Sequence, residues 1–191
     1  MFRLLTVLGC LLVAALVVLG FYYSIGSPVL KLREGELLPD LELPNLEGHG
    51  LIRLSSLREK PVVLVVFDTS WPATVPYLQQ IERLRARYHD RGLVVVGIST
   101  DADKEAVDNL LRTQQINFYV LRDPGAIYVR PAFGSPTAPT PDTFVIAPGL
   151  RVVAALAEPV DWRDPLERKR VEDLLPPPGW APSPPTARIS P

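Results

Sequence analysis

The longest hydrophobic run of the chain lies at its N-terminus. Residues Leu4 to Tyr23 are nearly all apolar, and no charged residue occurs between Arg3 and Lys31. Twenty helical residues, at about 1.5 Å rise per residue, span the ~30 Å hydrocarbon core of a bilayer. The pattern predicts a transmembrane anchor over residues 4–23, with residues 1–3 as its cytoplasmic end and residues 24–36 as a linker.

Two other interpretations of this run are a cleaved signal peptide and a lipoprotein signal at Cys10. A signal peptide has a hydrophobic segment of only ~7–15 residues followed by an A-x-A-like cleavage site. This run is longer and shows no good site. The apolar stretch before Cys10 is short for a lipoprotein signal and continues after it. An uncleaved anchor is therefore favoured, with Cys10 as a small residue inside the helix.

Beyond the linker, short β-branched runs alternate with amphipathic segments. Val62–Phe67 and Leu93–Ser99 are continuous apolar runs, which is typical of strands buried on both faces. Pro72 suits a helix start and Gly92 a helix end. The helix expected between them has one apolar face, made of Leu78, Ile81, Leu84 and Tyr88.

The second half continues the same alternation. Asp103 is expected to cap a helix. A short strand is predicted over Phe118–Leu121, a hairpin over Thr143–Ile146 and Arg151–Leu156, and a charged helix over Asp164–Leu175. Buried strands that alternate with helices predict an α/β fold with a parallel-containing sheet covered on both faces and an antiparallel edge.

The composition changes after Leu175. Residues 176–191 are rich in proline and poor in residues that build a core, which predicts a disordered tail. Pro182 and Pro185 have P-x-x-P spacing, so docking to an aromatic groove is the alternative for this tail.

Charge and cysteine content exclude several functions. The net charge of −1 gives no field that would attract nucleic acid, so no nucleic-acid partner is expected. The single cysteine, Cys10, cannot form an intramolecular disulfide, and two histidines without a cysteine cluster argue against a structural zinc site. We expect neither a metal nor a cofactor.

Four stretches resemble the thioredoxin-like redoxin superfamily. They are residues 38–57, with Leu-Pro-Asp-Leu-Glu-Leu at their start, then 60–67, 94–107 and 140–146. The similar members are membrane-tethered thiol–disulfide oxidoreductases of the TlpA and ResA kind and the alkyl hydroperoxide reductase/peroxiredoxin family. The resemblance covers residues 37–175 and implies a thioredoxin-like fold, with a central mixed sheet flanked by helices.

The sequence departs from the family where the chemistry occurs. Those oxidoreductases carry W-C-x-x-C after the central strand, and peroxiredoxins carry a peroxidatic cysteine there. Here that place holds no cysteine. Disulfide exchange requires a thiolate, and hydroxyl groups cannot replace it. No catalytic residue is predicted, and whether any enzymatic activity remains is open. The degenerate active-site segment consists of Asp68, Thr69, Ser70, Trp71, Pro72 and Thr74.

Two positions in this region retain a possible binding role. The resemblance implies that Thr140 and Pro141 form the family's cis-proline loop, which faces the active-site helix and presents backbone to an extended substrate. A trans loop proline is the alternative. Trp71 is interpreted either as an exposed anchor for a partner or as a buried plug in the space left by the thiols. Asp68 is interpreted as a loop or cap residue.

These observations favour a membrane-anchored redoxin domain without catalytic cysteines that binds or scaffolds in the cell envelope. Its expected partners are the membrane, through Leu4–Tyr23, and an extended polypeptide or envelope protein. The alternative is an oxidoreductase of the same family that works with a partner's cysteines. Local charge does not set the orientation, because Arg3 is balanced by Lys31 and Arg33. The resemblance implies a single-pass protein of a bacterial-type cytoplasmic membrane, with its domain facing the periplasm or exterior.

Overall fold

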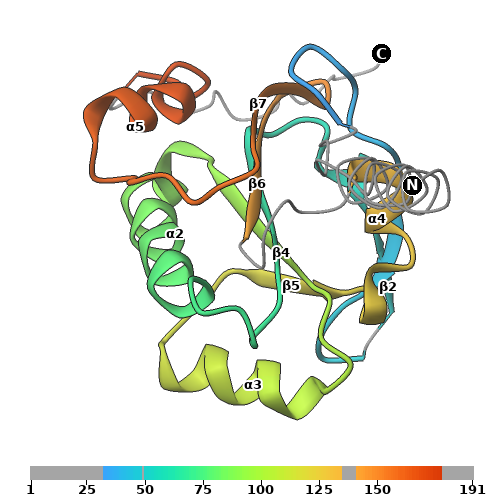
Figure 1. Cartoon of the computed structure of the whole chain (residues 1–191). Helices are drawn as coiled ribbons and strands as arrows, with labels where there is room; N and C mark the ends of the chain where they lie inside the picture. Colours follow the sequence, from blue (N-terminus) through green and yellow to red (C-terminus); the bar gives the residue numbers. More distant parts are fainter. Residues whose placement is uncertain (1–31, 49, 135–140, 178–191) are drawn as a thin grey trace, which may run out of the picture.

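The computed structural model describes residues 32–48, 50–134 and 141–177 (Figure 1). The expected anchor over residues 4–23, most of the proline-rich tail and Thr140 lie outside the described residues. Within the described ranges, no helix has both the length and the apolar character needed to cross a membrane.

A five-stranded mixed sheet forms the centre of the domain, with strand order β5-β4-β3-β6-β7. β3 (Val62–Phe67), β4 (Val94–Ser99) and β5 (Tyr119–Arg122) are parallel to one another. β6 (Asp142–Ala147) and β7 (Arg151–Leu156) form an antiparallel hairpin, and β6 pairs antiparallel with β3. The predicted α/β fold with a mixed sheet is therefore confirmed.

Burial of the central strand β3 on both faces explains why its sequence lacks polar residues. All six of its residues are buried, and their side chains alternate between two hydrophobic cores. One core contains residues of α2 (Thr74–Tyr88), α3 (Lys104–Thr113) and α5 (Pro165–Glu172), and the other contains residues of α4 (Val129–Phe133) and the N-terminal segment. Figure 1 shows α2 and α5 on one side of the sheet and α4 with β2 on the other.

A small hairpin precedes the sheet. β1 (Glu42–Pro44) pairs antiparallel with β2 (Leu51–Arg53), and the 3₁₀ turn η1 (Leu54–Leu57) follows. Leu43 is fully buried in the second core. The two strands of this hairpin form a separate two-stranded sheet.

Helix ends follow the residues expected to define them. The predicted apolar face of α2 is buried, and after the 3₁₀ turn η2 (His89–Arg91) the chain leaves through Gly92 at a φ of 93°. The Asp103 carboxylate caps α3 by accepting from the Glu105 N–H at 2.9 Å. Asp164 caps α5 in the same way.

Two features differ from the sequence-based expectation. The five-residue helix α4, which follows the turn η3 (Pro124–Ala126), was not predicted, since so short a helix shows no amphipathic period. The described end of the expected linker is packed on the domain: Leu32 is buried, and the Gly35 N–H donates to the Val152 carbonyl at 2.8 Å. The domain therefore begins before residue 37.

Candidate functional site

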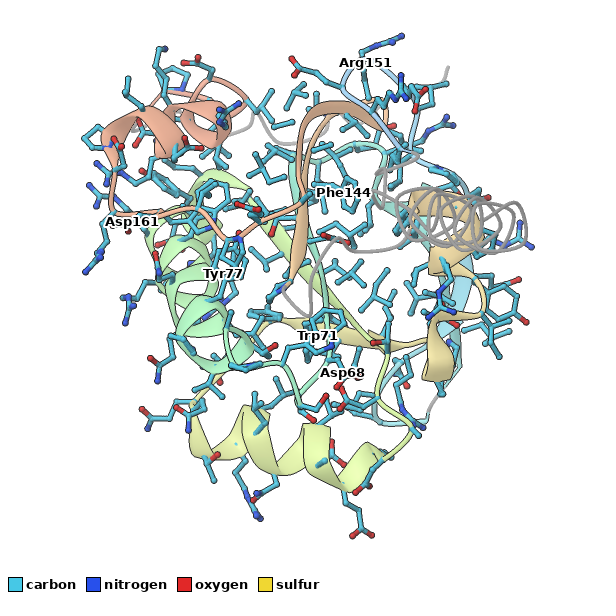
Figure 2. All side chains as sticks on the ribbon, viewed as in Figure 1. Asp68, Trp71, Tyr77, Phe144, Arg151 and Asp161 are labelled. Carbon is cyan, nitrogen blue, oxygen red and sulfur yellow. The ribbon has the colours of Figure 1, made fainter. Side chains whose placement is uncertain are left out.

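The loop at the position of the family's thiols lies at the end of the sheet where β3 and β4 finish and β6 begins. It joins β3 to α2, next to the C-terminal end of β4. β6 begins at the same edge, because Asp142 pairs with Val66 near the end of β3. Figure 2 shows Asp68 and Trp71 next to each other here, and the Trp71 N–H donates to the Asp68 carbonyl at 3.2 Å.

Asp68 holds the first turn of this loop. Its Oδ1 accepts from the Ser70 backbone N–H at 3.0 Å and from the Ser70 hydroxyl at 2.6 Å. Its Oδ2 accepts from the Thr100 hydroxyl at 3.3 Å, and its carbonyl accepts from Thr74 Oγ1 at 2.7 Å. These bonds support the interpretation of Asp68 as a loop residue.

Asp101, which the sequence did not single out, fixes the same loop from β4. Its buried carboxylate accepts from the Thr69 backbone N–H at 3.0 and 3.1 Å and from the Ser99 hydroxyl at 2.8 Å. The Thr69 hydroxyl also donates to it. A buried carboxylate with this many donors is well satisfied and holds the loop in one conformation.

This bonding decides what the hydroxyl groups of the loop can do. Thr69, Ser70 and Thr74 each donate to a carboxylate or carbonyl oxygen that belongs to the scaffold. A hydroxyl nucleophile needs an adjacent general base that is free to take its proton and is itself oriented for the reaction. Here the acceptors belong to the loop's own framework, so the hydroxyl groups stabilise its structure.

A cavity of about 240 Å³ opens between this loop and α4. Its apolar walls include Val66, Trp71, Val129 and Phe133, and its polar groups are Asp68, Thr100, Arg130 and Asp142. We call it the Trp71 cavity. Trp71 is half-buried and belongs to neither hydrophobic core, so it fits neither a freely exposed anchor nor a fully buried plug.

Asp142 is the most unusual group in the Trp71 cavity. Only 4% of this residue is exposed, and its Oδ1 is buried without a hydrogen-bond partner among the described residues. Burial raises the pKa of its carboxyl group to about 7, because the charged form loses its hydration. The sequence signal that could have found it is an acidic residue placed directly between Pro141 and a buried strand.

The sequence matches the AhpC/TSA family over residues 35–155. The chain belongs to this family. Its fold is that of the thioredoxin-like redoxins, which confirms the resemblance inferred from the sequence. No curated protein sequence matches the chain.

Three solved structures illustrate the similarity. A thiol:disulfide interchange protein from Chlorobium tepidum has a TM-score of 0.60 and 19% identity, covering 74% of this chain and 97% of that one. A secreted thiol-disulfide isomerase from Corynebacterium glutamicum has a TM-score of 0.64 and 18% identity, covering 72% of this chain and 84% of that one. The peroxidoxin BcpB from Mycobacterium tuberculosis has a TM-score of 0.60 and 20% identity, covering 75% of this chain and 96% of that one. At these identities the likeness shows the fold alone.

The redoxin fold brings two of the residues that the sequence singled out to one cavity, together with a residue that it did not. Asp68, Trp71 and the residue after Pro141 all line the Trp71 cavity, whereas Pro72 is exposed and Thr74 is buried beneath the loop. The bond from Thr140 to Pro141 starts outside the described residues, so its cis state stays a prediction.

A buried hydrogen-bonded chain sets the position of α2 in this redoxin domain. Tyr77 Oη lies 2.8 Å from Thr143 Oγ1, and the Trp162 indole N–H donates to Tyr77 Oη at 3.0 Å. Burial raises the pKa of Tyr77, so the phenol keeps its proton at neutral pH. These hydrogen bonds join α2 to Thr143, the residue after Asp142, and thereby fix one side of the site. In the described ranges, no three His, Cys, Asp or Glu side chains are grouped to hold a metal.

Proposed function

We propose that this protein is a membrane-anchored redoxin domain that binds an extended polypeptide in the cell envelope and performs no thiol chemistry itself. The binding site is the Trp71 cavity, at the position where related oxidoreductases carry their thiols. Two of the similar structures are described as disulfide-exchanging proteins, one of them secreted. The disulfide exchange named for these two proteins supports a polypeptide partner, and the secretion of one of them supports an envelope location.

One observation carries this proposal: the site keeps a cavity although it has no cysteine. If the thiols had been lost without any remaining role, hydrophobic side chains could have filled the space at native packing density. Instead a cavity of about 240 Å³ remains, and its lining contains a half-buried indole ring and a buried carboxyl oxygen that has no partner among the described residues.

These two groups suit a peptide that crosses the cavity mouth. The Trp71 indole supplies a large apolar contact, and tryptophan residues often contribute much of the binding energy of an interface. The Asp142 carboxyl group, with a pKa of about 7, can donate to a peptide carbonyl when protonated and accept from a peptide N–H when ionised. Both forms therefore offer a hydrogen bond to an extended backbone.

Co-purification from membranes tests the proposal and identifies the partner. Tagged full-length protein is extracted in mild detergent after cross-linking, and captured polypeptides are quantified for the wild type and for Trp71→Ala. Removing the indole should weaken capture by about 2 kcal/mol, roughly thirtyfold. The matched control is Tyr119→Ala, which removes an aromatic ring that is 69% exposed on edge strand β5 and should leave capture unchanged.

An equal recovery with wild type and Trp71→Ala would contradict binding at this cavity. Thiol–disulfide exchange that appears only when the captured partner's cysteines are present would instead favour the oxidoreductase alternative.

A further inference from the structure

A second recess lies away from the Trp71 cavity, between α2 and the segment that leads into α5. Its volume is about 210 Å³. Four guanidinium groups line it, from Arg83 and Arg87 on α2 and from Arg163 and Arg168 beyond β7. We call it the arginine recess. Asp161, which is labelled in Figure 2, directly precedes two lining residues, Trp162 and Arg163.

The fold assembles this recess by anchoring a tryptophan. Trp162 is 3% exposed, its indole N–H donates to Tyr77 Oη at 3.0 Å, and its backbone N–H donates to Gln80 Oε1 at 3.1 Å. These contacts pin the segment against α2 and bring the next residue, Arg163, over that helix. Arg83 and Arg87 are four residues apart, so they lie on one face of α2 in consecutive turns.

The positive charge of the recess is only partly compensated. The Asp161 carboxylate accepts from Arg163 Nε at 2.8 Å. Arg168 Nε lies 3.6 Å from Glu172 Oε1, beyond hydrogen-bonding distance, and is buried without a hydrogen-bond partner. Within the described ranges, Arg83 and Arg87 have no carboxylate within salt-bridge distance. Four cations thus share two carboxylates, so the recess carries an excess of positive charge that attracts an anion.

We propose that the arginine recess binds a phosphate group. The planar guanidinium fork matches phosphate oxygens and binds them through paired, charge-assisted hydrogen bonds. The recess is smaller than the ~300–1,000 Å³ pockets that hold drug-sized ligands, so it accommodates a compact anionic group. Leu84 and Trp162 provide apolar surface beside the cations.

The phosphate has two possible sources, a soluble phosphate compound or the headgroup of an anionic phospholipid. The guanidinium groups recognise the same atoms in both. The proposal does not depend on the function of the Trp71 cavity, because the two sites share no lining residue.

Calorimetric titration of the full chain in a neutral detergent tests the inference. Pyrophosphate and inorganic phosphate serve as soluble probes, and dihexanoyl-phosphatidylglycerol serves as the headgroup probe. Dihexanoyl-phosphatidylcholine and acetate are the comparison ligands. The double variant Arg83→Gln/Arg87→Gln should weaken binding by at least about tenfold, because it removes the two unpaired cations. Arg163→Gln should weaken it as well.

The matched control is Arg58→Gln/Arg112→Gln, which makes the same change in net charge on η1's flank and on α3. It should keep wild-type affinity. Binding of pyrophosphate or phosphate supports a soluble source, and selective binding of phosphatidylglycerol supports a headgroup.

Several results would overturn the assignment. These are no binding of any phosphate probe by the wild type, equal binding of acetate, or equal loss of binding in the control and recess variants. Unchanged affinity in a folded Arg83→Gln/Arg87→Gln protein, checked by circular dichroism, would also overturn it.

Discussion

Asp142 is a buried acidic residue that lowers the stability of the fold and lines the candidate site. Its neighbours on β6 and β3 form the hydrophobic core, and the strand register places its carboxyl group at the cavity without a partner. Burying an unpaired carboxylate is costly, and the group responds by holding its proton to higher pH. A residue that reduces stability in this way and faces a cavity is better explained by binding than by folding.

The pH dependence of stability measures this cost. The pKa of Asp142 is about 7 in the folded protein and ordinarily 3.8, so between these values only the folded state keeps the proton. The free energy of unfolding should therefore decrease as pH rises from about 4 to about 7, by an amount on the order of 4 kcal/mol, and then level off. Asp142→Asn removes this loss. Urea unfolding should find the variant similar to wild type at acidic pH and clearly more stable at pH above about 7.5. A stability difference that is the same at both pH values would show that Asp142 ionises normally.

A second prediction at the scale of single residues concerns the packing of Trp71. A fully buried plug would cost about 3–5 kcal/mol when truncated to alanine. Because Trp71 is only half-buried and lies outside both cores, Trp71→Ala should lower the free energy of unfolding by about 1 kcal/mol. Urea unfolding of this variant beside its capture assay separates a binding role from a packing role. A loss as large as that of a core residue would assign Trp71 to packing.

At the scale of elements, one carboxylate joins the ends of two parallel strands. Asp101, just after β4, accepts from Thr69, just after β3, and from Ser99 on β4 itself. The loop that replaces the thiols is therefore held by hydrogen bonds between neighbouring strand ends. In this arrangement the backbone at the cavity rim needs no covalent link to stay in place.

Removing this carboxylate should loosen the whole rim. Asp101→Ala leaves the Thr69 N–H and two hydroxyl groups without an acceptor in a buried setting, so unfolding should become easier by about 2–3 kcal/mol. The same substitution two residues later, Asp103→Ala, removes one helix cap and should cost only about 1 kcal/mol. Chemical denaturation of both variants, with amide exchange at Thr69, provides the comparison. Equal effects would mean that the Asp101 contacts do not stabilise the loop.

At the scale of the whole molecule, the first prediction concerns the proposed membrane anchor. If Leu4–Tyr23 spans the bilayer, the full-length protein should stay in the membrane fraction after high salt and alkaline carbonate, which release peripheral proteins. The test is immunoblotting of washed membranes, with N-terminal sequencing of the recovered protein. A mature soluble form that begins near residue 24 would identify a cleaved signal peptide instead.

The missing thiols predict the chemical behaviour of the whole chain. Cys10 is the only cysteine, so a Cys10→Ser protein contains no thiol. It should neither reduce insulin disulfides nor consume hydroperoxide, because both reactions pass through a cysteine sulfur. Insulin turbidity and peroxide-consumption assays on thioredoxin-free samples provide the check. Turnover above the buffer rate would reveal a reaction that the cysteine count does not anticipate.

The sequence by itself determined the redoxin fold and the absence of cysteine from the segment after β3. β3 and β4 are visible as apolar runs because both faces of each strand are buried, and the spacing of Leu78, Ile81 and Leu84 records the one buried face of α2. The absence of cysteine after β3 needs no structure to interpret. These features are local, so their residue types and spacing are sufficient to identify them.

Only the tertiary structure decided which polar groups share a site. Asp142 follows Asp68 by more than seventy residues in sequence, and Arg163 lies equally far from Arg87, yet each pair lines one cavity. Strand register brings Asp142 to the end of β3, and the Trp162 anchor places Arg163 over α2. Periodicity along the chain reports which residues are buried. It does not report which distant residues meet, because that depends on how the sheet orders its strands and how the helices pack against them.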